Sequence, residues 1–299
     1  MLDNNLAALL RSLADKYETA SFMDGDPSQF LRRYSQPRDQ ELAAFVVSQL
    51  SFGQREQFIA KLNAMFAAAD CGKPKTRATE IVRATKTAGA AKSACKPKTG
   101  GASFADWLAT GGYKKFFPKS QKKFYRFFSY ADMAALCGRL ARIVEEYGSL
   151  GAAVRARYGL EKPCGVGGPS LPQELRLVAA LISLFPGVKC VSQNPKGACK
   201  KLHMFLRWMV RRGSPVDLGL WDWVSAADLL IPLDTHVLQE SARLGLIAPN
   251  AAASAKTAID LTQKMAAAFP GDPARADYAL FGLGVDGELH QNDPLIKKF

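Results

Sequence analysis

The sequence has few of the residues that build metal centres and no stretch suited to a membrane span. Its cysteines, at positions 71, 95, 137, 164, 190 and 199, never form a C-x-x-C pair, so neither a zinc site nor an iron–sulfur cluster is indicated. Three histidines far apart in sequence indicate no His-rich centre either. No run of about eighteen apolar residues occurs, and the first residues lack the pattern of a signal peptide. We therefore expect a folded cytoplasmic protein that needs no metal or other cofactor.

An alternating strand pattern of any length is also missing. Apolar residues recur instead at helical spacing, and a hydrophobic content of 48% lets the 299 residues bury a large core. The fold class predicted is all-α, as one unit spanning 1–299. The segments expected to be helical are 4–21, 37–69, 104–108, 132–147, 172–184, 198–212, 220–230, 234–244, 253–269 and 273–283.

Positive charge is concentrated rather than spread along the chain, whose formal net charge is +13. Residues 72–99 contain eight Lys and Arg against one acid, and residues 111–130 contain six against none. These stretches account for the whole excess, a distribution typical of proteins that bind a polyanion such as DNA or RNA. Residues 70–102 also contain almost no large apolar side chain, so the sequence predicts a flexible basic insertion there.

The second basic stretch mixes its cations with aromatic residues. In a nucleic-acid-binding protein, such a mixture combines phosphate neutralisation with base stacking or wedging. The alternative is a core helix whose lysines face water, because Phe124, Phe127 and Phe128 fit one helical face. The residues assigned to the DNA backbone in this stretch are Lys114, Lys115, Lys122, Lys123 and Arg126.

The first of two short motifs runs from Asn194 to Phe205. A turn containing Pro195 and Gly197 precedes an apolar helix whose first N–H groups suit a phosphate, so Lys196 and Gly197 are also assigned to the DNA backbone. The alternative is a solvated helix start, although cations there are unfavourable for the helix dipole. A lysine crowded by cations and partly desolvated against the helix has a lowered pKa, and its free amine can form a Schiff base with a sugar carbon.

The second motif, Ile231 to His236, places Asp234 before another apolar helix. Its carboxylate is expected to cap that helix, stay ionised, and stabilise an oxocarbenium-like sugar or deprotonate the amine. An ordinary Asp cap is the more frequent explanation of Asp234 alone. Only its pairing with Lys200 favours catalysis.

These motifs together resemble the helix-hairpin-helix DNA glycosylases. Lys200 looks like their Schiff-base lysine, and Leu233–Val237 is similar to the Val-Asp-Thr-His element that carries their catalytic Asp. Ser48-Gln49-Leu50-Ser51 resembles the helix end whose Gln lies near the target nucleotide, and 277–284 is similar to a late helix of the fold. The resemblance implies a two-lobed helical fold that binds DNA between its lobes, with hairpin and catalytic Asp within 171–247.

A closer resemblance is to a bacterial family of no assigned activity, distantly related to those glycosylases, and it covers most of the chain except 70–102. The chain departs from the glycosylases in lacking the Leu-Pro-Gly-Val-Gly hairpin and the cluster cysteines of endonuclease III. Lys200 and Asp234 are also 34 positions apart. A similarly long separation makes the archaeal 8-oxoguanine glycosylases the nearest characterised branch.

The leading hypothesis is a base-excision DNA glycosylase, with AP-lyase activity in its bifunctional form, acting on a flipped damaged base. Lys200 would attack the sugar and Asp234 would stabilise charge, with Lys201 as the alternative nucleophile. Ser48, Gln49, Trp208 and His236 are the candidates for the base pocket. The alternative is a non-catalytic DNA- or RNA-binding protein on the same scaffold. Charge does not distinguish the two polymers, and neither hypothesis requires a membrane or an obligate protein partner; DNA binding would place the protein at the nucleoid.

Overall fold

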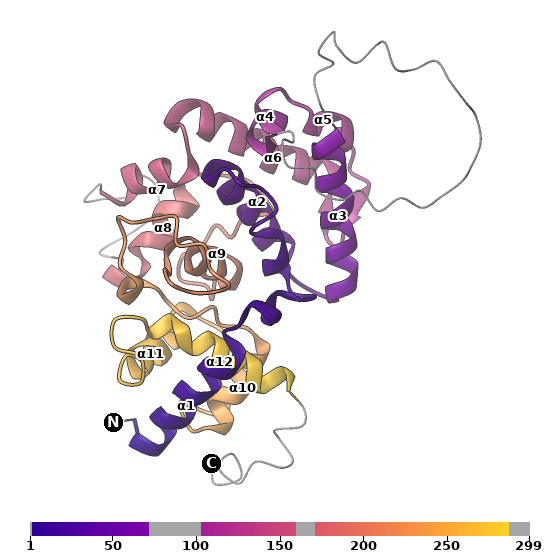
Figure 1. Ribbon diagram of the computed structural model, residues 1–299. Coiled ribbons are helices and arrows are strands. Elements are labelled where there is room, and N and C mark those ends of the chain that lie inside the picture. The colour runs from indigo at the N-terminus through magenta and orange to yellow at the C-terminus, as the bar shows by residue number, and fades with distance from the viewer. Residues whose placement is uncertain (1, 72–102, 160–170, 287–299) are drawn as a thin grey trace, which may run out of the picture.

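The computed structural model describes residues 2–71, 103–159 and 171–286, and most of its regular structure is α-helical (Figure 1). The predicted all-α class is therefore confirmed at this level. The predicted insertion lies outside the described residues except for its first two positions, which end a helix. No helix in the described ranges is long and apolar enough to cross a membrane.

The helices form two groups that share one continuous hydrophobic core (Figure 1). The larger group consists of α2 (Pro37–Leu50), α3 (Arg55–Cys71), α4 (Phe104–Ala109), α5 (Tyr113–Phe116), α6 (Tyr130–Tyr147), α7 (Leu150–Tyr158), α8 (Arg176–Ser183) and α9 (Lys200–Val210). The smaller group consists of α1 (Asn4–Tyr17), α10 (Thr235–Arg243), α11 (Ala255–Met265) and α12 (Ala276–Val285). Helix α1 packs along α12, so helices from opposite ends of the chain are neighbours.

Short 3₁₀ turns connect the groups or precede their helices. They are η1 (Ala20–Met23), η2 (Pro27–Phe30), η4 (Gln173–Leu175), η5 (Ala226–Asp228) and η6 (Pro273–Arg275). The chain enters the larger group through η1 and η2 and returns along residues 211–234. Both crossing segments consequently lie where the two groups meet.

Local sequence signals explain several helix ends. Ser129 and Asp132 form a capping box at the start of α6, and Gly148 ends that helix with a φ of 80°. Asp234 caps α10 by accepting a hydrogen bond from the amide of Val237 at 2.9 Å. The cap expected at Asp234 is thus present.

Two expectations from spacing are corrected by the structure. Residues 220–230 form no α-helix, and their only helical turn is the 3₁₀ turn η5, although Trp221, Leu229 and Leu230 are buried in the core. Residues 122–128 do not form a core helix; an antiparallel hairpin joins β1 (Lys123–Tyr125) to β2 (Phe128–Ser129). Aromatic residues suit strands, and Arg126 at a φ of 49° allows the tight turn that a helix would exclude.

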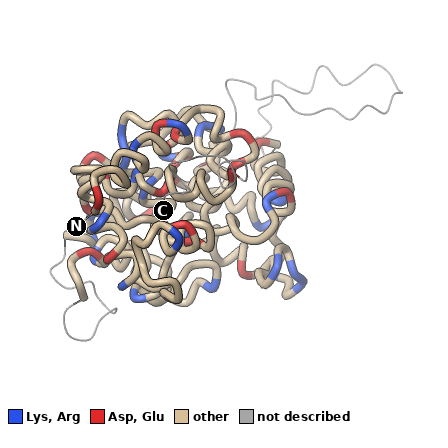
Figure 2. Tube along the Cα trace, turned by 90° about the horizontal axis from the view of Figure 1, so that it is seen from below, with Lys and Arg blue, Asp and Glu red and all other residues tan. Residues whose placement is uncertain are grey.

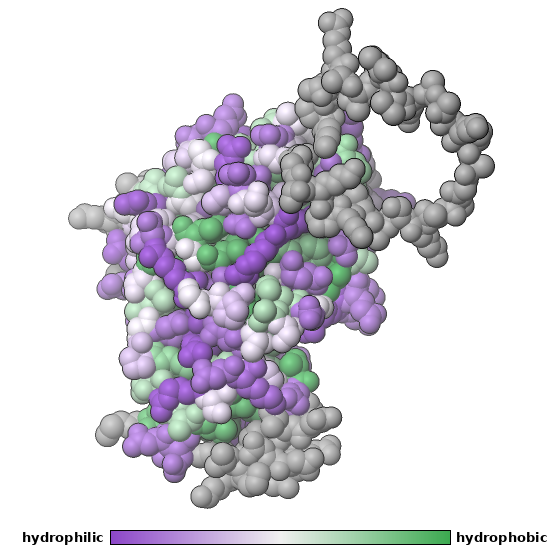
Figure 3. Space-filling model, in the orientation of Figure 1, coloured by the Kyte–Doolittle hydropathy of each residue, from purple (hydrophilic) through white to green (hydrophobic). Residues whose placement is uncertain are grey.

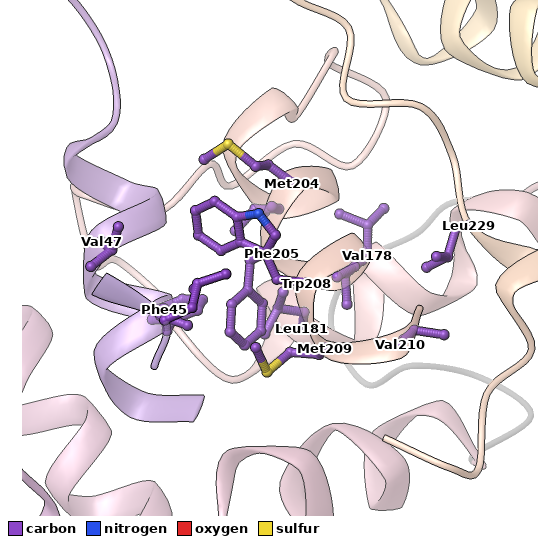
Figure 4. Close-up of a cluster of buried hydrophobic side chains, with 14 of the residues drawn as sticks. Phe45, Val47, Val178, Leu181, Met204, Phe205, Trp208, Met209, Val210 and Leu229 are labelled. Atoms are coloured by element: carbon purple, nitrogen blue, oxygen red, sulfur yellow. The ribbon is translucent and has the colours of Figure 1, made fainter. Parts of the chain in front are cut away.

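Helix α9 lies at the centre of the core. Phe45 of α2 stacks on Phe185 with 4.6 Å between ring centroids and meets Phe205 of α9 edge-on at 5.0 Å. Figure 4 shows this cluster, with Trp208 and Met204 on the same helix. Nine of the eleven α9 residues are buried, so little freedom remains in how the helix is oriented.

A buried ion network joins the end of α9 to the smaller group of helices. Arg211 contacts the carboxylates of Glu18 at 2.7 Å, Asp217 at 2.5 Å and Asp272 at 2.8 Å. The hydroxyl of Tyr278 donates a hydrogen bond to Asp217 at 2.9 Å. Because Arg211, Glu18 and Asp217 are buried, each of these three charges depends on its partners for solvation.

We expect Arg211→Met to lower the free energy of unfolding by about 3 kcal/mol or more, since it removes one of the two cations from each of the buried carboxylates Glu18 and Asp217. Urea denaturation measures this change. The control is Lys256→Met, which breaks the exposed pair with Asp260 and should cost about 0.5 kcal/mol or less. Similar losses in both variants would show that the network contributes no more than a surface pair.

Candidate functional site

A cavity of about 530 Å³ lies between the two groups of helices. This volume is in the range of about 300–1,000 Å³ found for small-molecule sites. Its walls come from η1 and η2, the loop after α2, one face of α9, the start of α10, and α12. The side chains used below are Phe52, Lys200, Lys201, Met204, Arg207, Trp208, Asp234, His236, Asp277 and Tyr278.

Lys200 and Asp234 meet in this cavity. The Nζ atom of Lys200 lies 3.8 Å from Oδ2 of Asp234, and the side chains are 30% and 17% exposed. The other carboxylate oxygen, Oδ1, accepts the capping hydrogen bond from Val237. Since that bond fixes the carboxylate, its second oxygen is held toward the amine. The two motifs that the sequence paired are therefore neighbours in space.

Lys201 differs from Lys200 in its surroundings. Its Nζ atom donates hydrogen bonds to the carbonyl oxygens of Gln49 and Cys190, both at 3.2 Å. The same atom lies 5.2 Å from the ring centroid of Phe52 and 5.1 Å from that of Phe128. Burial lowers the pKa of Lys201 to about 8, with the charge of Lys200 acting in the same direction. The desolvated amine expected from the sequence is thus Lys201, which ties α9 to the end of α2.

The inner part of the cavity contains charged side chains and one buried hydrogen-bond donor without a partner among the described residues. Arg207 forms an ion pair with Asp277, and burial raises the pKa of Asp277 to about 7 while Arg207 opposes that rise. The indole Nε1 of Trp208 has no hydrogen-bond partner among the described residues, although the side chain is 1% exposed. A buried donor of this kind can be satisfied by an acceptor on a ligand.

In the turn before α9, the backbone amides form hydrogen bonds within the turn itself. The amide of Lys196 donates to Oδ1 of Asn194 at 3.0 Å, and the amide of Gly197 donates to the carbonyl of Asn194 at 3.2 Å. These two amides are used within the turn, whereas the phosphate contact expected from the sequence involves the first amides of the helix; the side chain of Lys196 is exposed. Cys199, at a φ of 44°, provides no side-chain cap to α9, so the first amides of the helix remain suited to an anion.

Ser48 and Gln49 do not reach the cavity. Both side chains are 0% exposed, and the side-chain Nε2 of Gln49 donates a hydrogen bond to the hydroxyl of Ser48 at 2.8 Å. They point into the core because α2 is buried over its last ten residues. The loop just after them, through Phe52, lines the cavity instead. Their expected contact with a nucleotide is thus not supported.

The other expected residues lie in or near the site. Trp208 lines the inner cavity, and His236 is exposed at its edge, packed edge-on to Phe281 at 5.7 Å. The cations assigned to the DNA backbone, Lys114, Lys115, Lys122, Lys123 and Arg126, are all exposed. The guanidinium of Arg126 lies beside Gly53, in the loop that lines the cavity wall.

Met204, Arg207 and Asp277 line the cavity although none of them was among the candidate site residues. Helical spacing could have found the first two, since positions 200, 204, 207 and 208 lie on one face of α9. No comparable sequence signal places Asp277 opposite that face. Within the described residues, no group of three or more His, Cys, Asp or Glu could hold a metal ion.

Charges are distributed over several sides of the described body, with basic and acidic segments interspersed (Figure 2). Hydrophilic residues cover most of the described surface facing the viewer in Figure 3, with smaller hydrophobic areas between them.

A model of a protein family described as being of unknown function, DUF2400, matches residues 26–95 and 97–286. This chain belongs to the DUF2400 family. The match includes the cavity motifs around Lys200 and Asp234 and every described helix from α2 to α12. No curated protein and no solved structure matches this DUF2400 chain.

The lowered pKa of Lys201 predicts a pH effect on stability. Between pH 8 and pH 10.5, the folded DUF2400 chain binds fewer protons at this amine than the unfolded chain does. The free energy of unfolding of the wild type should therefore rise with pH in this window relative to Lys201→Met. Denaturation of both proteins at several pH values measures the difference, and a difference that is constant with pH would contradict the assignment.

Proposed function

We propose that this protein is a base-excision DNA glycosylase of the helix-hairpin-helix type, with an AP-lyase step that uses Lys200. The observation that carries the proposal is the amine of Lys200 facing a fixed carboxylate oxygen of Asp234 inside a cavity between two groups of helices. An amine and a carboxylate in this arrangement are what Schiff-base chemistry on a sugar requires. The grouping of α1 with α10–α12, apart from α2–α9, agrees with a two-lobed glycosylase scaffold.

The reaction proposed starts with a damaged nucleotide turned out of the duplex into the cavity. The bond between C1′ and the base nitrogen breaks, and its electron pair leaves with the base, which takes up a proton. Asp234 stabilises the positive charge that develops on the sugar. Lys200 then gives one proton to Asp234 and bonds to C1′ through its nitrogen. One of the two protons left on that nitrogen moves to O4′ as the C1′–O4′ bond breaks, and the product is the protonated imine.

The inner cavity offers groups for the base itself. The unpaired Nε1 of Trp208 can donate to a carbonyl or ring nitrogen, and Met204 provides an apolar, polarisable contact next to it. Asp277, with its raised pKa, can act as donor or acceptor near neutral pH. We infer that the substrate is a base with hydrogen-bonding groups on its edge.

A second function has one observation in its favour. The amides of Lys196 and Gly197 are used within their own turn, which removes the usual backbone grip of the glycosylase hairpin. A DNA- or RNA-binding protein without catalysis would retain the exposed cations and need no such grip. It would bind intact and lesion-bearing duplexes equally, with the same strong dependence on salt.

The test is covalent trapping with borohydride on duplexes that carry an abasic site, 8-oxoguanine, uracil or an alkylated base. We expect an adduct with the wild type and a loss of at least 100-fold in Lys200→Gln, since the nucleophile is removed. Lys201→Gln is the matched control, which should retain the adduct because Lys201 bonds to backbone carbonyls.

The pattern of adducts separates the hypotheses. Trapping that persists in Lys200→Gln and disappears in Lys201→Gln would transfer the nucleophile to Lys201. No adduct with any duplex, together with equal affinity for intact and damaged DNA at every salt concentration, would favour the non-catalytic binder.

A further inference from the structure

Phe127 has the most exposed large hydrophobic side chain among the described residues. It is 59% exposed and lies at the tip of the hairpin between β1 and β2. Its neighbours in the hairpin, Phe124 and Phe128, are buried. The hairpin therefore leaves more than half of the Phe127 side chain open to solvent, where a ligand can cover it.

The backbone at the hairpin tip is held in an uncommon conformation. Arg126 has a φ of 49°, the left-handed region in which hairpin turns normally place Gly, Asn or Asp. A bulky side chain there is sterically unfavourable, and such strain is concentrated at functional sites. Glycine would suit the turn but would lose the guanidinium that lies against Gly53.

The hairpin tip is attached to the rim of the cavity. The ring of Phe127 stacks on Phe52 with 5.0 Å between centroids and 25° between planes, and Phe52 lines the cavity. The hydroxyl of Tyr125 donates a hydrogen bond to the carbonyl of Phe52. The Nζ atom of Lys201 lies 5.2 Å from the centroid of the Phe52 ring, and both residues line the cavity. The two stacked rings therefore continue the cavity wall outward to the surface.

The surroundings of the ring are positively charged. Lys122, Lys123 and Arg126 are exposed, and none of them forms an ion pair with a described residue. Residues 111–130 contain no acid. An exposed ring flanked by free cations matches a nucleic acid strand, in which a flat base and a charged phosphate occur in each nucleotide.

We propose that Phe127, supported by Phe52, is a stacking platform for an unpaired base of DNA at the rim of the cavity, with Lys122, Lys123 and Arg126 neutralising the flanking phosphates. The inference rests on the proposed function in taking DNA as the ligand. It adds that the protein recognises an unpaired base next to the nucleotide in the cavity, and that this recognition is separable from Lys200 chemistry.

The experiment measures affinity by fluorescence anisotropy for three DNA duplexes of one sequence: fully paired, with one tetrahydrofuran abasic analogue, and with a two-nucleotide gap. We expect Phe127→Ala to lose about tenfold in affinity for the last two duplexes, since stacking of a base on an aromatic side chain has about this effect. Affinity for paired DNA should change less than twofold. Phe127→Tyr, which keeps the ring, should bind all three like the wild type.

A second variant tests the cations. Lys122→Gln combined with Lys123→Gln should weaken binding to all three duplexes equally and make the dependence on salt less steep. Loss of affinity for paired DNA in Phe127→Ala as large as for the gapped duplex would overturn the stacking role. Tighter binding of an RNA strand than of the DNA strand of the same sequence would overturn the choice of DNA.

Trapping with borohydride distinguishes failure of this inference from failure of the proposed function. A wild type that forms adducts, with Phe127→Ala unchanged in affinity for unpaired bases, would overturn the platform alone. A wild type that forms no adduct, with Phe127→Ala still selectively weakened on gapped DNA, would overturn the catalytic proposal and support the platform. Equal unfolding midpoints of wild type and Phe127→Ala ensure that the comparison is between folded proteins.

Discussion

The structure depends most on the buried charges at the end of α9. Arg207 and Arg211 share Asp217, and each also contacts a carboxylate from the smaller group of helices. The guanidinium of Arg207 lies 4.2 Å from the ring centroid of Tyr278 in α12. Charges buried this deeply are tolerated only with their partners in place, so the network restricts how the two groups of helices can sit against each other. The cavity lies at that junction, and its shape follows from the same contacts.

Helix α9 connects this network to the chemistry proposed. Its first residue, Lys200, faces Asp234, and Arg207 lies two turns further along the same face of the helix. Because nine of its residues are buried, α9 cannot rotate or slide without disrupting the core. The amine is therefore held by packing, while the carboxylate is held by a helix cap at 2.9 Å. The packing of α9 and the cap of α10 therefore fix the two partners of this ion pair independently.

The three proposed activities lie at increasing distances from the pair of Lys200 and Asp234, or on different sides of it. Schiff-base chemistry would take place between Lys200 and Asp234, base recognition deeper at Trp208, and strand recognition outside at Phe127. Lys201 and Phe52 lie between the inner and outer parts, in contact with each other. The DUF2400 family, to which the chain belongs, is described as being of unknown function.

Much of the helical fold could be predicted from the sequence, because apolar spacing and capping residues act within a few positions along the chain. The apolar spacing gave most helices, and Pro232 with the apolar run after Asp234 predicted the cap and hence the fixed carboxylate. The sequence limits the candidate nucleophiles to Lys200 and Lys201. It does not choose between them, because successive residues on a helix point about 100° apart and the direction of the cavity is not known from the sequence. Only the packing around α9 decided that Lys200 faces Asp234 while Lys201 bonds to buried carbonyls. Gln49 is buried and Phe127 exposed for a similar reason: contacts with segments distant in sequence determine which side of each element meets the core.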